Sequence, residues 1–470
     1  MVLKFYNTMS RKKEVFTPIE GKKVNLYVCG LTVYDFPHVG HSRVYIMWDL
    51  LRRYLDYSGY DVKHVQNITD IHDSIINRAK KENVSLEELT EKFTDVAFED
   101  MDRLRIKRAH VYPKVTEHIK EIIEMVQTLI DKGFAYVTED GSVYYKISSF
   151  KDYGKLSRID LTQTKAGARV TVDDYKENPQ DFALWKSADD EPRWDSPWGK
   201  GRPGWHIECS VMAVKHLGET LDIHTGGRDH YFPHHENEIA QSEGATGKTF
   251  SNYWMHTAFI NIGGEKMSKS LNNFITIRDI LKKYKPEVLR MFMISAHYRT
   301  PVDYNPKNIE HAKASLDRLE IFLDNISFYK KSAPETGSED SEVLGLIKES
   351  KRRFINSMDD DLNAPGAIES LFSFVKSINK IIAGKDAIGR NTIDSIKAHL
   401  YDMDQIFSIL PEEDNEKGEI SDKVNDLIEK REVARKEKDF STADEIRDKL
   451  DKMGIILEDT DSGIKWRKKS

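Results

Sequence analysis

Residues 24–56 read VNLYVCGLTVYDFPHVGHSRVYIMWDLLRRYLD, and this stretch decides the fold class. The apolar run over 24–29 is typical of a buried strand. After a short loop, apolar side chains recur at helical spacing and predict a helix over 41–56. A second strand is predicted to end at residues 67–69. Strand, helix and strand in this order indicate a parallel sheet of the α/β class.

The same alternation resumes in the middle of the chain. Valine and tyrosine side chains flank the turn sequence Asp140-Gly141, which predicts a hairpin over 134–147, inserted between two halves of the sheet. The run 221–224 predicts a further strand, and Pro233 suits the first turn of the helix after it. Loops that join such strands to helices lie at the edge of the sheet where ligands bind.

The pattern becomes helical after about residue 305. Polar segments 333–340 and 411–419 are predicted linkers that delimit a helical bundle and a small C-terminal unit. Two apolar stripes at helical spacing predict helices of the bundle; the first consists of Ala312, Leu316, Leu319 and Leu323, and the second of Ile368, Phe372, Val375 and Ile382.

The composition fits a globular enzyme and excludes other classes. A chain of 470 residues suggests about three domains at roughly 150 residues each. No stretch reaches the roughly 20 apolar residues of a membrane span, and no secretory signal opens the chain, so we expect a cytoplasmic protein. The formal charge of -7 argues against nucleic-acid binding by bulk charge alone and leaves local basic patches open.

The sequence PHVGH at 37–41 lies between the first predicted strand and its helix. Free backbone N–H groups and the helix dipole favour anions such as phosphate there, and His38 and His41 can add hydrogen bonds. Gly40 has no side chain, so a base or ribose can approach the backbone closely. Taken alone, the motif favours the simpler interpretation of two loop histidines, one of them a helix cap.

The sequence KMSKS at 266–270 follows a Gly-Gly pair, so its two lysines lie on a loop with a flexible hinge. Lysines in such a place can neutralise a leaving pyrophosphate. Adenylation depends mainly on positioning and on charge stabilisation during in-line attack at the α-phosphate. A solvated lysine loop is the alternative interpretation.

A third candidate combines a helix pair with the two cysteines of the chain. His234 and Glu238 are four residues apart, so one helix face presents both side chains to the same ion. Cys29 ends the first strand, and Cys209 precedes the strand that leads to the His234 helix. A zinc site of two thiolates, one imidazole and one carboxylate is plausible. A surface ion pair and two incidental buried thiols remain the alternative.

Four longer stretches then show a resemblance along nearly the whole chain: YVCGLTVYD at 27–35, GRPGWHIECS at 201–210, FPHHENEIAQ at 232–241 and EKMSKSL at 265–271. In this order they are similar to the cysteinyl-tRNA synthetase family of class I aminoacyl-tRNA synthetases. The resemblance implies a Rossmann-like parallel-sheet catalytic domain with an inserted connective segment, followed by an α-helical bundle and a small C-terminal anticodon-binding domain.

The resemblance also implies domain boundaries. It places the two halves of the catalytic domain at 1–115 and 201–255, on either side of the connective segment 116–200. A stem-contact region with the KMSKS loop then covers 256–310, the helical bundle 311–410 and the anticodon-binding domain 411–470.

The resemblance assigns roles to single residues. It implies that Cys29, Cys209, His234 and Glu238 hold one zinc ion, whose further ligand is the soft thiolate of the substrate, which a serine hydroxyl cannot replace cheaply. It implies that ATP, with Mg²⁺, is bound by His38, Gly40, His41, Asp229, Lys266, Ser268 and Lys269, of which His38, His41, Lys266 and Lys269 are the catalytic set. It places Gly30, Thr69, Trp205 and His224 around L-cysteine.

The C-terminal match includes MDDDLNAP at 358–365, MGIILED at 453–459 and GIKWR at 463–467, which resemble the tRNA-binding half of the family. The candidates to contact the anticodon are Arg435, Asp444, Asp459 and Trp466, for which solvated helix positions are the alternative. The family also implies a monomer. Departures from the family pattern occur at 227–231, His72 and Asn272.

The predicted function is cysteine–tRNA ligation in two steps, through cysteinyl-adenylate. One rival is a cysteine ligase that passes the activated cysteine to an amino sugar, but such a relative is similar only up to the bundle. A second rival is a non-catalytic tRNA-binding protein or a structural zinc module with the same fold. The intact signature histidines and KMSKS sequence argue against this second rival.

Overall fold

The computed structural model describes residues 2–159, 175–267, 273–384, 387–411, 417–460 and 463–468. The chain divides into two compact units. The first contains residues 1–308 together with 356–365, and the second contains 309–355 and 366–470.

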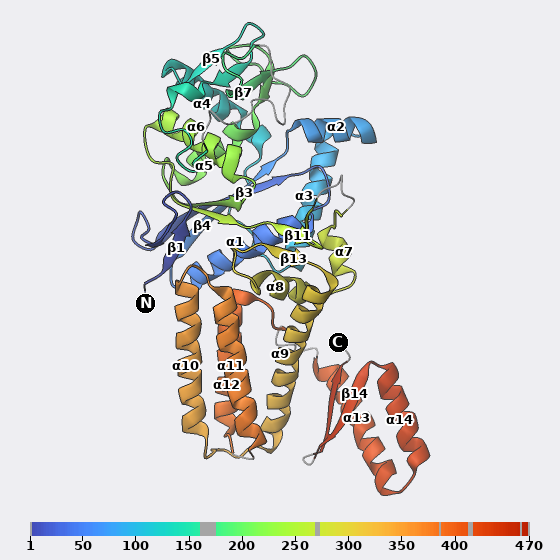
Figure 1. Ribbon diagram of the computed structural model, residues 1–470. Coiled ribbons are helices and arrows are strands. Elements are labelled where there is room, and N and C mark those ends of the chain that lie inside the picture. Colours follow the sequence, from blue (N-terminus) through green and yellow to red (C-terminus); the bar gives the residue numbers. More distant parts are fainter. Residues whose placement is uncertain are drawn as a thin grey trace. The chain divides into compact units, whose positions relative to one another are not determined.

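Four parallel strands form the central sheet of the first unit, in the order β10-β9-β3-β4 (Figure 1). These strands are β3 (Lys23–Thr32), β4 (Asp61–Thr69), β9 (Leu221–Gly227) and β10 (Ser251–Thr257). All seven residues of β9 are buried, as expected for a parallel strand covered on both faces. The predicted parallel sheet and the strands at 24–29, 67–69 and 221–224 are therefore confirmed.

Helices cover both faces of this sheet. Figure 1 shows α1 (Val39–Tyr57) on one face and α5 (Trp205–Leu217) with α6 (Glu236–Thr246) on the other. The helix predicted over 41–56 is thus confirmed, and its buried side includes Ile46, Trp48 and Leu51. Because a parallel pair needs a crossover connection, α1 carries the chain from the end of β3 back to the start of β4.

The connective region forms a separate antiparallel sheet, β5-β6-β7-β8. Its strands are β5 (Ala135–Val137), β6 (Val143–Tyr145), β7 (Phe182–Ser187) and β8 (Gly201–Pro203), preceded by η1 (Val115–His118) and α4 (Ile119–Asp131), with η2 (Ile147–Ser149) after β6. The predicted hairpin at 134–147 corresponds to β5 and β6.

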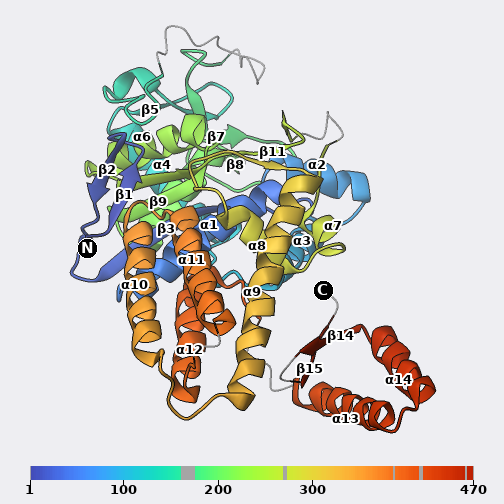
Figure 2. The same ribbon diagram turned by 60° about the horizontal axis from the view of Figure 1, so that its bottom comes forward.

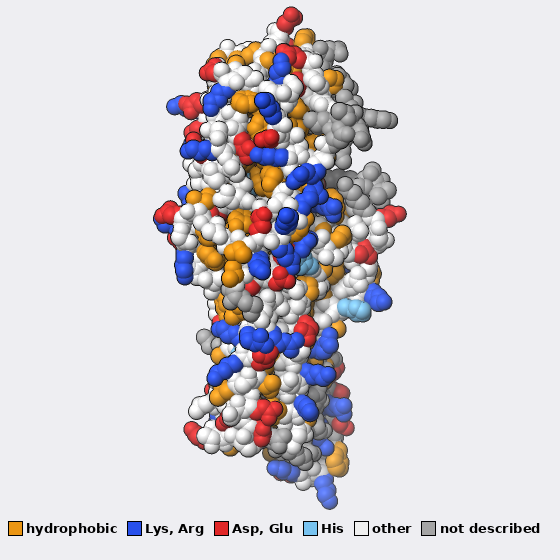
Figure 3. Space-filling model, turned by 60° about the vertical axis from the view of Figure 1, so that its left-hand side comes forward, with side chains coloured by type: hydrophobic (Ala, Val, Ile, Leu, Met, Phe, Trp, Pro, Cys, Tyr) orange, Lys and Arg blue, Asp and Glu red, His pale blue; other side chains and the backbone are white. Residues whose placement is uncertain are grey.

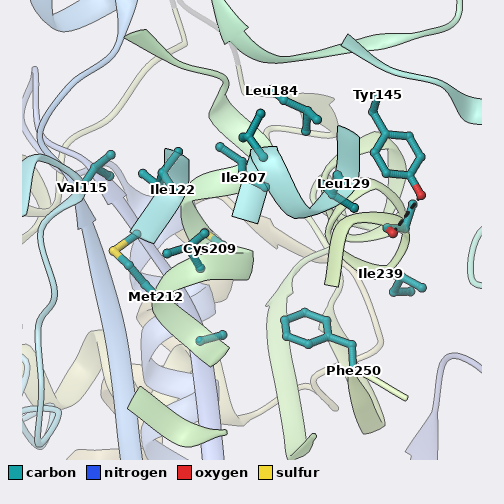
Figure 4. Packing of buried hydrophobic residues seen from close by; sticks show 14 of the residues in the cluster. Val115, Ile122, Leu129, Tyr145, Leu184, Ile207, Cys209, Met212, Ile239 and Phe250 are labelled. Carbon is teal, nitrogen blue, oxygen red and sulfur yellow. Dashed lines mark hydrogen bonds between the residues drawn. The ribbon is translucent and has the colours of Figure 1, made fainter. Parts of the chain in front are cut away.

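One hydrophobic core joins this sheet to the central one. Figure 4 shows Ile122 and Leu129 of α4 beside Ile207 and Met212 of α5, and all four side chains are fully buried. The hydroxyl of Tyr145 donates a hydrogen bond to the carbonyl of Ala240 in α6 at 2.9 Å. The same core surrounds Cys209, so it fixes the position of that thiol.

The remaining elements of the first unit flank the central sheet. Strands β12-β11-β13 form a small sheet in which β11 pairs in parallel with β13. The bounds are β1 (Lys4–Asn7), β2 (Lys12–Val15), α2 (Asp73–Glu82), α3 (Leu86–Arg103), η4 (Tyr231–His235), β11 (Ile260–Ile262), β12 (Glu265–Lys266), α7 (Ile277–Leu281), α8 (Pro286–Ile294) and β13 (Val302–Tyr304).

The second unit is mainly helical (Figure 2). Its long helices are α9 (Pro306–Ser332), α10 (Asp340–Asp359), α11 (Ala364–Ala383) and α12 (Arg390–Phe407). They are followed by α13 (Lys417–Lys436), α14 (Phe440–Lys452) and the hairpin of β14 (Ile455–Thr460) and β15 (Gly463–Lys468), with Val424, Leu450 and Ile455 in a small core.

Two details of the helices differ from the predictions. The regular helix predicted to begin at Pro233 begins at Glu236, because Phe232 has an extended backbone (φ −145°, ψ 133°) and only a single wide turn, η4, precedes α6. In α11, Ile368 and Val375 are buried, but Phe372 and Ile382 of the predicted stripe are only half-buried. The fully buried face lies over Ala367, Leu371, Phe374 and Ile378. The stripe in α9 is confirmed.

The structure confirms the first predicted linker, whereas part of the second linker lies outside the described residues. Residues 333–339 do join α9 to α10, whereas residues 412–416 of the second linker lie outside the described part of the chain. The domain boundaries taken from the resemblance stay predictions. Among the described residues, no helix is long and apolar enough to cross a membrane.

We expect Leu129→Ala to destabilise the first unit by about 3 kcal/mol, because Leu129 is fully buried in the shared core and its loss leaves a cavity. Urea unfolding followed by tryptophan fluorescence measures the change. Leu344→Ala is the control, because Leu344 is 43% exposed on α10. A Leu129→Ala protein as stable as this control would contradict the packing.

Candidate functional site

A cleft opens at the carboxyl ends of the central parallel strands, where the sheet topology favours a ligand site. The ends of β3, β4 and β9 contribute Gly30, Thr69 and Gly227 to its lining. The segment before α1 and its first turn contribute His38, Gly40 and His41, and Ala258, Phe259 and Met267 also line the cleft. Both predicted signature segments therefore reach one cleft.

Four predicted metal ligands meet at the inner end of this cleft. Cys29 comes from β3, Cys209 from α5, His234 from η4 and Glu238 from α6. All four are buried, and each offers one ligand atom within 4.8 Å of the others. The sequence thus brings together side chains that are up to 209 residues apart.

Individual contacts define the geometry of this cluster. The Sγ atom of Cys29 lies 3.7 Å from Oε1 of Glu238, and Nε2 of His234 lies 3.0 Å from the same oxygen. The His234–Glu238 contact needs only their four-residue spacing, which places both on one face even across the junction of η4 and α6. Two thiols, an imidazole and a carboxylate are donor types that transition metals bind.

The electrostatics of the cluster favour a positive charge. Burial raises the pKa of Cys29, whereas a hydrogen bond from Cys29 lowers the pKa of Cys209 to about 6. Burial alone would lower the pKa of His234, but Glu238 and Cys209 outweigh it and raise that pKa to about 10. Burial would also raise the pKa of Glu238, yet His224 and His234 hold it well below its usual value. Glu238 and Cys209 therefore stabilise a positive charge on His234.

Further histidines surround the cluster. A second set that can hold an ion shares Cys29 and Glu238 and adds His224 and His235. His224 Nε2 lies 2.7 Å from Glu238 Oε2, and His235 Nε2 lies 3.3 Å from Cys29 Sγ. Sequence reasoning missed His235 and also His206, whose Nδ1 lies 2.9 Å from that of His234. His206 lies three residues before Cys209 on α5, but this spacing gave no such signal, because its contact with His234 is tertiary.

The two signature histidines fix each other. The backbone N–H of His38 donates to Nδ1 of His41 at 3.2 Å, and the backbone N–H of His41 donates to Nδ1 of His38 at 3.3 Å. The rings stack with their centroids 3.6 Å apart. Since both Nδ1 atoms accept, each neutral ring carries its proton on Nε2. Burial and the neighbouring His38 lower the pKa of His41 well below its usual value.

Two glycines of the cleft have no room for a side chain. A Cβ atom on Gly30 would lie 1.6 Å from the carbonyl oxygen of Asn67, and one on Gly40 would lie 2.9 Å from the His38 ring. The backbone of Gly30 instead donates to the Asn67 side chain at 2.8 Å. Both positions therefore keep backbone exposed to the cleft.

The other residues expected around the ligands lie at different depths. Thr69, Trp205 and Asp229 line the cleft, and Trp205 is 38% exposed with its ring 4.6 Å from that of His234. His224 is fully buried and reaches Glu238 rather than the cleft lining. Thr69 donates a hydrogen bond to Glu208 at 3.0 Å, a buried carboxylate that sequence reasoning missed.

The KMSKS sequence is described only at its start. Lys266 ends β12, and Met267 lines the cleft, whereas Ser268, Lys269 and Ser270 lie outside the described residues. Beyond them, the backbone N–H groups of Val39 and Ile277 bond to the carbonyls of Ile275 and Pro37, both at 3.0 Å. The chain after the KMSKS loop is therefore tied directly to the first signature.

The predicted anticodon residues lie on the C-terminal elements. Arg435 on α13 and Asp444 on α14 are exposed, and Arg435 has Glu432 4.0 Å away. Asp459 and Trp466 lie on the paired strands β14 and β15, opposite Ile464 and Leu457. On the face shown in Figure 3, side chains of both charges are mixed, and Lys and Arg gather in several groups rather than in one continuous patch.

Comparison with protein families covers most of the chain. Residues 15–314 match the family described as "tRNA synthetases class I (C) catalytic domain". Residues 353–411 match the DALR domain, and residues 417–467 match the "Cysteinyl-tRNA ligase anticodon binding domain". The three matches follow one another in the order of the catalytic fold, the bundle and the C-terminal unit.

Known relatives are similar over their whole length. The chain is 48% identical over 464 residues to a cysteine–tRNA ligase of Caldicellulosiruptor saccharolyticus, covering 98% of this chain and 99% of that one. It is 46% identical to one of Thermococcus gammatolerans, covering 100% and 99%. Among solved structures, Mycobacterium tuberculosis methionyl-tRNA synthetase has a similar fold, with a TM-score of 0.60 at 14% identity over 83% of this chain and 90% of that one.

Proposed function

The chain belongs to the cysteine–tRNA ligase family of class I aminoacyl-tRNA synthetases, and we propose that Cys29, Cys209, His234 and Glu238 select cysteine by holding one zinc ion. As a member of this family, it joins cysteine to tRNA and converts ATP to AMP and pyrophosphate. The observation that carries the proposal is the meeting of these four buried side chains at the inner end of the cleft.

The reaction proceeds in two steps in the same cleft. In the first, a carboxylate oxygen of cysteine attacks the α-phosphorus of ATP in line, and the bond to the leaving pyrophosphate breaks. In the second, a hydroxyl of the terminal tRNA ribose attacks the carbonyl carbon of cysteinyl-adenylate, and AMP leaves. The protein contributes mainly position and complementary charge to both steps.

The paired histidines donate to phosphate oxygens. Because backbone N–H groups occupy both Nδ1 atoms, the neutral rings of His38 and His41 carry their protons on Nε2 at the N-terminus of α1. The helix dipole adds positive potential at the same point. Lys266, Ser268 and Lys269 of the second signature complete the phosphate site in this proposal, with Mg²⁺ bound to the ATP.

The buried cluster fits zinc because its donors are those of zinc sites and its charges favour a cation. When bound, zinc supplies a soft Lewis-acid site for the sulfur of the substrate. His224 Nε2 lies 2.7 Å from Oε2 of Glu238 and orients that carboxylate.

The remaining cleft residues hold the amino acid and the nucleotide in this proposal. Gly30, Thr69 and Trp205 surround cysteine, with His224 acting through Glu238. Asp229 and the backbone at Gly40 contact the nucleotide side of the cleft. Trp205 packs against the imidazole of His234, with the ring centroids 4.6 Å apart.

Residues 417–467 bind tRNA, as their match to an anticodon-binding domain implies. Arg435, Asp444, Asp459 and Trp466 are the proposed anticodon contacts. The proposal also includes the domain boundaries given above, a monomeric state and a cytoplasmic location.

A transfer assay with labelled cysteine tests the function against its rival. We expect ester formation on tRNA(Cys) and none with an amino sugar. Charging of the sugar amine without charging of tRNA would favour the rival ligase. Binding of tRNA without any cysteinyl-adenylate would favour a non-catalytic protein.

We expect His41→Ala to lower kcat of cysteine-dependent pyrophosphate exchange by about 10²- to 10³-fold, because one preorganised phosphate donor is lost. Since the pKa of His41 lies well below its usual value, the ring is neutral at both pH 6.5 and pH 8.5, and the loss should be equal at the two. His41→Asn, which keeps an N–H donor, should recover part of the rate. Full activity of His41→Ala would contradict this role.

A further inference from the structure

Three consecutive aspartates lie where α10 leads into α11: Asp359 is the last residue of α10, and Asp360 and Asp361 follow in the turn. This turn belongs to the first unit, although its two helices belong mainly to the second. Asp359 accepts a hydrogen bond from the hydroxyl of Tyr54 on α1 at 2.5 Å. Asp360 forms an exposed ion pair with Lys13 at 2.7 Å. Asp361 is fully buried with a left-handed backbone (φ 65°). The turn therefore contacts the catalytic fold through each of its acidic residues.

Asp361 organises the short segment 296–300 that follows α8. Its carboxylate accepts hydrogen bonds from the Tyr298 hydroxyl at 2.6 Å and from Nε of Arg299 at 2.9 Å. The same side chain accepts from the backbone N–H of Tyr6 at 2.7 Å, and its backbone carbonyl lies 2.9 Å from Nε2 of His297. Several hydrogen bonds fix the position of the buried Asp361 carboxylate, and the same bonds fix the positions of the groups that donate to it.

Arg43 donates hydrogen bonds to backbone carbonyls of the same segment. This guanidinium is 1% exposed, and it donates to the carbonyls of His297 at 2.8 Å and Thr300 at 3.3 Å, and to that of Met293 at the end of α8. Burial lowers its pKa to about 9, so it stays charged at neutral pH. Its charge is complementary to the carbonyl end of α8.

Both Asp361 and Arg43 thus hold segment 296–300 by hydrogen bonds. Two connections link this segment to the cleft, one through Arg43 on α1 and one through the backbone of residues 258 and 259. Arg43 lies five residues after His38 on the helix that His38 caps. The carbonyl of Tyr298 accepts from the backbone N–H of Ala258 at 2.8 Å, and the N–H of Val302 donates to the carbonyl of Phe259 at 3.2 Å. Ala258 and Phe259 line the same cleft as the signature histidines.

We propose that Asp361 is a positioning residue for adenylate formation, which acts through segment 296–300 and Arg43 to set the first turn of α1 relative to Ala258 and Phe259 of the cleft lining. The inference rests on the proposed function. It makes the chemistry of the cleft depend on a side chain of the turn that joins the two helices α10 and α11. Misplacement of catalytic groups by about 1 Å is sufficient to slow a reaction by roughly 10²-fold.

The test compares full-length variants by cysteine-dependent pyrophosphate exchange at 25 °C. We expect Asp361→Asn, which keeps the shape and removes the charge, to lower kcat by about 10- to 100-fold. The KM for cysteine should change less than about twofold, because the pocket residues are untouched. Tyr298→Phe, which removes one donor and keeps the carboxylate, should give a smaller loss of kcat in the same direction. Lys13→Ala is the control, because Lys13 on β2 pairs with Asp360 of the same turn, and an exposed ion pair of this kind contributes little.

A double-mutant cycle of Asp361→Asn and Arg43→Lys tests whether Asp361 acts through segment 296–300 and Arg43. If both residues act through segment 296–300, the combined loss of kcat is smaller than the product of the single losses. A combined loss of kcat equal to the product of the single losses would show that the two residues act independently, which would contradict action through segment 296–300. A lowered melting temperature of both Asp361→Asn and Tyr298→Phe with unchanged kcat would show a structural role only and overturn the proposal. Absence of cysteine-dependent exchange in the wild type and in Lys13→Ala would instead be a failure of the proposed function.

Discussion

Cysteine is expected to support pyrophosphate exchange about 10⁴-fold better than serine in kcat/KM. The two substrates differ by one atom and have nearly the same shape, so packing against Trp205 and Thr69 cannot separate them to this extent. The cluster of Cys29, Cys209, His234 and Glu238 can, because it presents a site for a soft donor where a hydroxyl binds poorly.

Exchange rates with each amino acid over a range of concentrations measure this selectivity. Alanine is a useful third substrate, because it lacks the hydroxyl but fits the same space. Equal rates for cysteine and serine would contradict selection by the buried cluster. A strong preference for cysteine that survived removal of bound metal by a chelator would contradict it as well.

The second large effect is expected from Cys209→Ser, which should lose its metal and reduce cysteine-dependent exchange to the level of serine, about 10⁴-fold. Cys209 is the thiol with the lowered pKa, so it is the donor best prepared to bind as thiolate. Its replacement changes one buried atom in α5, and the fold should be largely kept.

Elemental analysis and exchange on the same preparation measure both parts of this prediction. Met212→Leu is the matched control, because Met212 is fully buried on the same helix and the change conserves volume. It should keep its metal and its activity. A Cys209→Ser protein that kept one metal per chain and full exchange would remove Cys209 from the site.

Much of the fold follows from local pattern. The apolar runs that became β3 and β9 and the helical spacing that became α1 are local signals, and tertiary packing agrees with them. The start of α6 was misplaced because residues 231–235 form a separate wide turn, η4, in which Phe232 is extended, as the following Pro233 favours. The buried face of α11 was misplaced by about one position, because half-buried Phe372 is as apolar as the core side chains.

The sequence predicted those residues of the site whose proximity depends on a single helix or on the order of the strands. The spacing of His234 and Glu238 puts them on one face, and a parallel sheet brings the end of β3 to the same edge as β9. The contacts of His206, His235 and Glu208 arise only when distant elements pack, so no sequence pattern marks them. The roles of Lys266, Ser268 and Lys269 stay predictions.

Cobalt(II) substitution tests the central claim most directly, because cobalt accepts the same ligands as zinc and its thiolate absorption reports on bound sulfur. The metal-free protein should take up one cobalt per chain with thiolate absorption from Cys29 and Cys209. Addition of cysteine should increase that absorption, and addition of serine should not. An unchanged spectrum with cysteine, or no cobalt bound at all, would contradict the account.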